Sequence, residues 1–98
     1  MKFYIKTHES IRSYVIAIAD ENLIGKKIKD KIIEINISEQ FYKGQLCNEK
    51  KAAILLQECP NINIIGKNII KLAKKLNLIN EENIVYFKNV PHCQIYCI

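Results

Sequence analysis

The sequence contains no apolar stretch that is long enough to span a membrane. The longest candidates, such as residues 32–37, are interrupted by Glu34 and Asn36, whereas a spanning helix needs about 20 consecutive apolar residues. The segment MKFYIKTHES at residues 1–10 also lacks the apolar core and the small-residue cleavage site of a secretion signal. We therefore expect a cytoplasmic protein that has no membrane partner.

Arginine is almost missing, because Arg12 is the only arginine and lysine supplies the other basic residues. Basic residues outnumber acidic ones by 15 to 10, which gives a formal net charge of +5. A positive net charge is compatible with binding to an anionic partner. The scarcity of arginine argues against base-specific recognition of nucleic acid, since arginine makes the commonest bidentate contact to guanine.

Paired metal-binding cysteines are also missing. The four cysteines, Cys47, Cys59, Cys93 and Cys97, form no Cys-x-x-Cys motif, and we expect reduced thiols that pack as small hydrophobic side chains. Cys93 and Cys97 lie on one predicted strand, where their side chains are roughly 13 Å apart and too distant to share a zinc ion. His92 and Cys93 are neighbours on that strand and point to opposite faces, although His8 can still approach from across the sheet. We predict no metal, no cofactor and no catalytic residue.

The hydrophobic pattern predicts one α+β domain over residues 1–98, and we find no linker, repeat or low-complexity segment. We expect a five-stranded, mostly antiparallel sheet with two main helices on one face. The strands are predicted at residues 2–6, 13–19, 33–37, 84–87 and 93–98. The first helix is predicted between an N-cap at Asn48 and Pro60, and the second at residues 65–76. Asp20 is predicted to cap a short helical turn that Gly25 ends in a left-handed conformation.

Lysines gather in two segments. Lys26, Lys27, Lys29 and Lys31 lie in one predicted connection, and Lys67, Lys71, Lys74 and Lys75 lie on the polar side of the second predicted helix. We predict nucleic-acid contacts for Lys26, Lys27, Lys67, Lys71, Lys74 and Lys75, through the release of counterions from phosphates. The alternative is that these are ordinary solubilising lysines, and Lys74 and Lys75 also suit the negative end of a helix. Gly25-Lys26 and Gly66-Lys67 are similar to phosphate-binding turns, but neither completes the GxxxxGK[ST] motif.

Four short motifs resemble those of an archaeal family of small proteins, domain-of-unknown-function family 424. They are DENLIGKK (residues 20–27), FYKG (41–44), NINIIGK (61–67) and VPHCQI (90–95). The matching positions are Gly25, Lys26, Phe41, Tyr42, Asn63, Gly66, Val90, Pro91, His92 and Gln94. Lys43 stands where the family often has glycine, and Cys93 where it often has alanine, which speaks against catalysis by Cys93. The resemblance implies no established activity.

The same resemblance motivates a second hypothesis, a small polar pocket formed by Tyr42, Asn63, His92 and Gln94. His92 and Gln94 project from one face of the final predicted strand. The alternative is a buried histidine that is bonded to a backbone carbonyl.

We predict a non-enzymatic binding module that associates with RNA or with a ribonucleoprotein machine such as the ribosome. The alternative is a small-molecule-binding protein or an enzyme that uses the pocket around His92 and Gln94.

Overall fold

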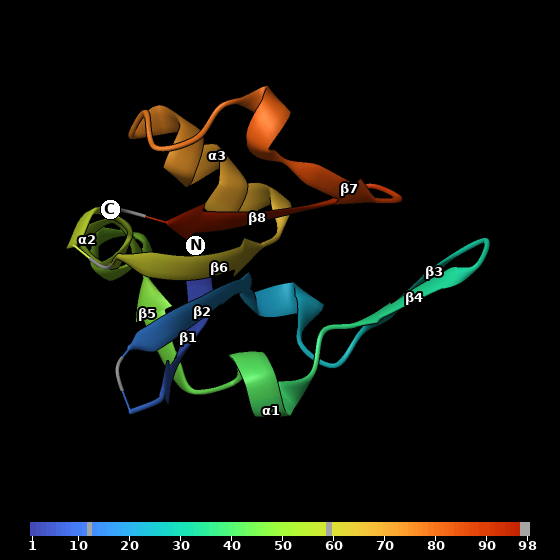
Figure 1. Cartoon of the computed structure of the whole chain (residues 1–98), viewed down its shortest axis with the longest axis horizontal. Coiled ribbons are helices and arrows are strands. Elements are labelled where there is room, and N and C mark those ends of the chain that lie inside the picture. Colours follow the sequence, from blue (N-terminus) through green and yellow to red (C-terminus); the bar gives the residue numbers. More distant parts are fainter. Residues whose placement is uncertain (12, 59, 97–98) are drawn as a thin grey trace.

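The computed structural model describes residues 1–11, 13–58 and 60–96. A mixed sheet of six strands runs through the molecule, in the order β5-β1-β2-β6-β8-β7 (Figure 1). Its strands are β1 (Lys2–Glu9), β2 (Tyr14–Asp20), β5 (Gln45–Asn48), β6 (Asn61–Ile65), β7 (Val85–Phe87) and β8 (Val90–Tyr96). β2 and β6 pair in parallel, and the other four pairings are antiparallel.

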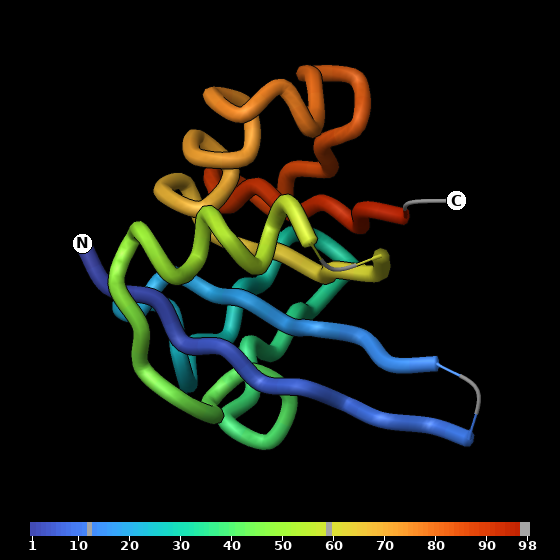
Figure 2. The backbone as a smooth tube through the Cα atoms, turned by 90° about the vertical axis from the view of Figure 1, so that its left-hand side faces the viewer, coloured from blue at the N-terminus to red at the C-terminus, as the bar shows by residue number. Residues whose placement is uncertain are grey.

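Two helices cover one face of this sheet, as the sequence predicts. α2 (Glu49–Glu58) contributes Ala52 and Leu56 to the main hydrophobic core, and α3 (Lys67–Lys75) contributes Ile69, Ile70, Leu72 and Ala73. The strands supply alternate residues to the same core, among them Ile16, Ile18, Ile62, Ile64, Cys93 and Ile95. In Figure 2, α2 lies in front of the strands, whereas the hairpin of residues 27–36 lies behind them.

A second, smaller cluster lies on the opposite face, where the intervening strand residues point. Ala17, Ala19 and Ile65 from the sheet pack there with Leu23, Ile37 and Tyr42. The covering segments are the short turn η1 (Glu21–Leu23), the helix α1 (Glu39–Tyr42) and a two-stranded hairpin of β3 (Lys27–Asp30) and β4 (Ile33–Asn36). The hairpin projects away from the sheet (Figure 1), but Ile28 and Ile35 at its base pack against the cluster.

The sheet is mostly antiparallel, as predicted, but the prediction of its five strands is wrong in three respects. The predicted strand at residues 33–37 lies outside the main sheet, because Ile35 pairs with Ile28 in the hairpin. β5 has only four residues, too few for a clear alternating pattern. β6 is missing from the predicted strands. Its sequence Asn-Ile-Asn-Ile-Ile does alternate, but Ile65 also fits the helical spacing of the residues that follow, so the pattern predicts it as part of the helix.

The predicted caps are partly confirmed. Asn48 caps α2 by accepting a hydrogen bond from the backbone N–H of Lys51 at 2.9 Å. Gly25 has a φ of +84° and donates its N–H to the carbonyl of Ile37 at 2.7 Å. Asp20 makes no side-chain cap of the turn η1, because its carboxylate binds a different helix. No helix in the described part of the chain is both long enough and apolar enough to cross a bilayer.

Candidate functional site

The first turn of α3 is held by a carboxylate from a distant strand. Asp20, at the end of β2, accepts hydrogen bonds from the backbone N–H groups of Asn68 at 2.8 Å and Ile69 at 2.9 Å. Asp20 is only 3% exposed, and this burial raises the pKa of its carboxyl while the two backbone hydrogen bonds oppose the rise. Gly66, with a φ of +123°, permits the close contact between the helix and Asp20.

The outer side of α3 carries the four lysines that the sequence singles out, and we call this side the lysine face (Lys67, Lys71, Lys74 and Lys75). The buried residues of the helix, such as Ile69 and Ala73, point to the core instead. Among the described residues, Lys67, Lys71 and Lys75 form no ion pair. The lysine face is therefore a row of cations at the surface.

Three of these lysines surround one surface hollow of about 220 Å³. We call it the lysine hollow, and its lining residues are Lys67, Ile70, Lys71, Lys74, Tyr86, Asn89 and Pro91. Tyr86 comes from β7 and is 50% exposed. The hollow thus combines several positive charges with an aromatic side chain.

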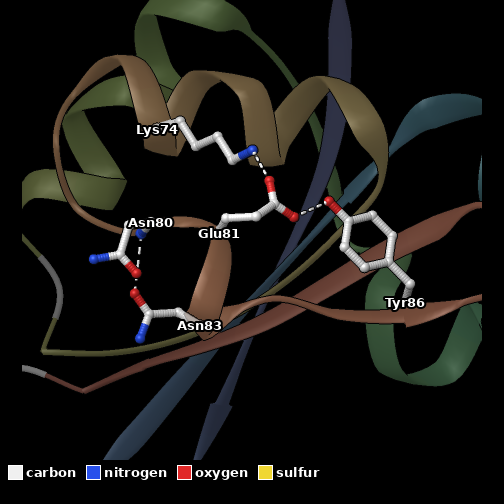
Figure 3. A network of polar contacts seen from close by, with 5 residues as sticks. All are labelled: Lys74, Asn80, Glu81, Asn83 and Tyr86. Atoms are coloured by element: carbon white, nitrogen blue, oxygen red, sulfur yellow. Dashed lines mark hydrogen bonds and ion pairs between the residues drawn. The ribbon is translucent and has the colours of Figure 1, made fainter.

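A hydrogen-bonded network fixes one wall of the lysine hollow (Figure 3). Glu81 accepts a hydrogen bond from Lys74 Nζ at 2.5 Å and another from the hydroxyl of Tyr86 at 2.5 Å. The hydrogen bond with Glu81 raises the pKa of Lys74, and the hydrogen bond from Lys74 lowers the pKa of Glu81. Asn80 and Asn83 close the short turn η2 (Glu81–Asn83) that carries Glu81. Lys74 stays charged, but part of its charge is balanced by Glu81.

A second hollow of about 260 Å³ adjoins the first, since Lys67 and Asn89 line both. We call it the amide hollow because three asparagines line it. Its residues are Asp20, Asn22, Leu23, Lys67, Asn68, Asn89 and Val90. It lies where β2 and β6, the parallel pair, end, the edge at which ligands commonly bind in α/β sheets.

The structure separates the six predicted lysines into two groups. Lys26 follows the turn η1, and Lys27 begins β3 at the base of the hairpin. Both side chains are exposed, but they belong to a different element from the lysine face. Tyr86, Asn22, Asn68 and Asn89 line these hollows but cannot be recognised as site residues from the sequence, because nothing in their spacing links β7 to α3 or to the turn after β2.

The four residues of the predicted polar pocket come together on the sheet face opposite α2 and α3. The hydroxyl of Tyr42 donates to Asn63 Oδ1 at 2.6 Å, and Asn63 Nδ2 donates to Gln94 Oε1 at 2.9 Å. His92 Nε2 lies 3.1 Å from Asn63 Oδ1. The chain of hydrogen bonds continues from Gln94 Nε2 to Asn61 Oδ1 at 2.7 Å. We call these five residues the polar cluster.

The donors and acceptors of the polar cluster determine the state of His92. Burial raises the pKa of Tyr42 to about 12, so its hydroxyl keeps its proton and donates to Asn63. Asn63 Oδ1 is an acceptor, and His92 Nε2 must therefore carry a proton and donate. Burial also lowers the pKa of His92, which favours the neutral ring. Nδ1 is then the acceptor atom of the ring.

The two cysteines in the described part of the chain show no arrangement that indicates catalysis. Cys47 and Cys93 are buried free thiols, and burial raises the pKa of both. Cys93 packs in the main core while His92 points to the other face, as predicted. His8 Nε2 bonds the carbonyl of Phe41 at 2.7 Å. Cys59 and Cys97 lie outside the described residues. The predicted distance between the side chains of Cys93 and Cys97 therefore stays a prediction.

Comparison with known proteins places this architecture in a family. A crystal structure of an uncharacterized conserved protein from Methanopyrus kandleri is similar to the whole chain, with a TM-score of 0.81 and 28% sequence identity. The match covers 100% of this chain and 93% of that one. No curated protein matches the sequence. The model of a family described as "Protein of unknown function (DUF424)" matches residues 8–98. The chain therefore belongs to the DUF424 family, as its four sequence motifs imply.

Proposed function

We propose that this protein is a non-enzymatic RNA-binding module that acts in the cytoplasm, alone on RNA or within a ribonucleoprotein machine such as the ribosome. One observation carries the proposal: Lys67, Lys71 and Lys74 line a single hollow together with the exposed ring of Tyr86. Grooves that combine lysines with aromatic side chains are typical of proteins that bind single-stranded nucleic acid.

The geometry of α3 supports contact with several phosphates at once. Lys67, Lys71 and Lys75 follow one another at i, i+4 spacing, which is a rise of about 6 Å per step along one side of a helix. Each lysine that meets a phosphate releases condensed counterions, so a row of lysines contributes cumulatively. The chain has a formal net charge of +5, which also favours the approach of a polyanion.

The proposed recognition depends on the backbone and on stacking. Lysine is a point charge that does not read base edges in the bidentate manner of arginine. Tyr86 can stack on any base, because every base has an aromatic face. Glu81 holds the Tyr86 hydroxyl through its hydrogen bond, which keeps the ring beside the lysines. Lys26 and Lys27 remain proposed contacts for a longer RNA that also reaches the hairpin.

The test compares two variants with the same change of charge. Lys67→Glu/Lys71→Glu alters the lysine hollow, whereas Lys50→Glu/Lys51→Glu alters exposed residues of α2. In fluorescence anisotropy with a short single-stranded RNA at low salt, the first variant should bind at least about tenfold more weakly than the second. Equal weakening of both variants, or no RNA binding by the parent protein, would contradict the proposal.

The identity of the partner requires a separate experiment. Affinity purification from native cells, with and without nuclease, distinguishes a partner that is bound through RNA from one that is bound directly. Under the proposal, nuclease treatment removes most of the co-purifying material. A co-purifying protein that persists after nuclease treatment at an unchanged amount would point to a direct protein contact instead.

A second candidate function is a small-molecule site at the polar cluster. It is favoured by the convergence of Tyr42, Asn63, His92 and Gln94 from α1, β6 and β8, and by the acceptor that His92 Nδ1 presents. Such a site suits a small neutral molecule that donates a hydrogen bond. Nuclear magnetic resonance of the His92 ring during addition of the common nucleosides and amino acids tests it. Unchanged ring signals with every one of these probes would argue against the site.

A further inference from the structure

We propose that the amide hollow receives an unpaired nucleobase of the same RNA strand whose phosphates contact the lysine hollow. This inference rests on the proposed function and adds the part of the nucleotide that the lysines do not contact. The two hollows adjoin at Lys67 and Asn89. A nucleotide also consists of adjoining parts, an anionic phosphate and an uncharged base. The phosphate suits the lysine hollow, and the base suits the amide hollow beside it.

Asp20 excludes a phosphate from the amide hollow. An open helix N-terminus binds anions through its backbone N–H groups, but at α3 the carboxylate of Asp20 already accepts from Asn68 and Ile69. A phosphate placed there would meet a negative charge and would find these two N–H groups occupied. Lys67 lines the same hollow and disfavours a cation. The remaining class of ligand is uncharged.

The asparagines of the amide hollow offer what the edge of a base requires. A side-chain amide provides two donor hydrogens and one acceptor oxygen, and base edges present donors and acceptors side by side. Asn61, Asn63, Asn80 and Asn83 bond their neighbours through their side chains. Within the described part of the chain, the side chains of Asn22, Asn68 and Asn89 have no such partner, so their amides are open to a ligand.

The volume and the lining also suit a group with an apolar face. Leu23 is buried, Val90 is half-buried, and both line the amide hollow, where they can pack against the face of a base. The volume of about 260 Å³ lies just below the roughly 300–1,000 Å³ of pockets that enclose whole drug-sized ligands. It therefore suits one base better than a complete nucleotide.

The test uses two single-stranded RNAs of equal length and charge, one with bases and one abasic. We expect the parent protein to bind the base-containing RNA about tenfold more tightly than the abasic RNA, as a few lost stacking and hydrogen-bond contacts predict. Asn22→Ala/Asn89→Ala should lose most of this preference, and Asn22→Ala alone, which changes no residue of the lysine hollow, should lose part of it and still bind the abasic RNA as the parent does. Both residues are exposed, so the variant should fold, which circular dichroism checks.

The control variant is Tyr86→Leu, because stacking on Tyr86 can also create a preference for base-containing RNA. If Tyr86→Leu loses the preference and Asn22→Ala/Asn89→Ala keeps it, the base stacks on Tyr86 and the inference is overturned. Equal binding of both RNAs by the parent protein also overturns it, while the proposed function survives. Failure of the parent to bind either RNA refutes the proposed function itself.

Discussion

Asp20 illustrates how far a single side chain can act from its place in the sequence. The motif around it predicts a local cap, whereas the carboxylate caps α3, almost half the chain away. Local propensity cannot indicate this contact, because it depends on the parallel pairing of β2 with β6. The glycine of the NINIIGK motif has a physical reason as well: Gly66 leaves room for the Asp20 carboxylate.

Gly66→Ala should lower the free energy of unfolding by about 2–4 kcal/mol, which urea denaturation can measure. A Cβ at this position would lie 2.3 Å from Asp20 Cγ, and the φ of +123° is one that alanine rarely adopts; strain and loss of a cap each cost about 1–2 kcal/mol or more. Gly25→Ala is the matched control, because its φ is also positive but its Cβ would meet nothing within 4 Å. If Gly25→Ala lowered the free energy of unfolding as much as Gly66→Ala does, the role assigned to Asp20 would be contradicted.

His92 should make stability depend on pH. Burial lowers its pKa in the folded protein, whereas in the unfolded chain the ring takes up a proton below about pH 6.5. The unfolded state then binds more protons, so the free energy of unfolding should fall as the pH decreases below about 6.5, by at most about 1.4 kcal/mol per pH unit. Tyr42, the other titratable group of the polar cluster, has a pKa of about 12 and stays protonated throughout this range.

The measurement is urea denaturation at several pH values for the parent protein and for His92→Gln. Glutamine keeps an N–H that can donate to Asn63 but has no titrating ring. We expect the variant to show a shallower pH dependence below about pH 6.5. The same slope in both proteins would mean that His92 stays protonated in the folded state or that it is solvated as in the unfolded chain.

At the scale of elements, the sequence predicts the helices better than the strands. The stripe of Ile69, Leu72 and Ala73 opposite the lysine face identifies α3 unambiguously, because a helix of this length repeats its pattern more than twice. Short strands carry too few residues for the same certainty, as β5 shows. The meeting of Tyr42, Asn63, His92 and Gln94 was expected only from the family motifs, since three separate elements supply these residues.

The residues at the base of the β3–β4 hairpin should contribute to the stability of the protein, whereas those at its tip should not. Ile28 and Ile35 pack against the second cluster, whereas Ile32 at the tip is 97% exposed. Ile28→Ala/Ile35→Ala should therefore lower the free energy of unfolding by about 2–4 kcal/mol, less than for fully buried residues. Ile32→Ser should change it by less than about 0.5 kcal/mol. Thermal denaturation of both variants checks this, and equal effects would contradict the packing described for the base.

At the scale of the whole molecule, charge can be counted from the sequence, but its distribution cannot. The count of 15 basic and 10 acidic residues says nothing about which lysines share a surface. The structure brings Lys67, Lys71 and Lys74 to one hollow and pairs Lys74 with Glu81. It places Lys26 and Lys27 at the base of the hairpin. These positions follow from tertiary contacts between α3, η2 and β7 that no local pattern encodes.

The distribution of charge predicts the salt dependence of the proposed RNA binding. If three or four lysines of the lysine face contact phosphates, the logarithm of the binding constant should fall with the logarithm of salt concentration at a slope of roughly −2 to −3 for a single strand. Lys67→Glu/Lys71→Glu should reduce the magnitude of that slope by more than one. Anisotropy titrations over a series of salt concentrations measure it, and a slope near zero would exclude phosphate contacts as the main source of affinity.

The parallel pairing of β2 with β6 also has a consequence for how the chain is made. β6 leaves the ribosome after β1, β2, the hairpin, α1, β5 and α2, because it follows them in the sequence. Ile16 of β2 therefore cannot pair with Ile62 until β6 has been made. Until then, one side of β2 exposes its backbone donors and acceptors, and such an edge can pair with other chains. The nascent protein is therefore most prone to aggregation while synthesis passes through the middle of the sequence, and the arrival of residues 61–65 ends that interval.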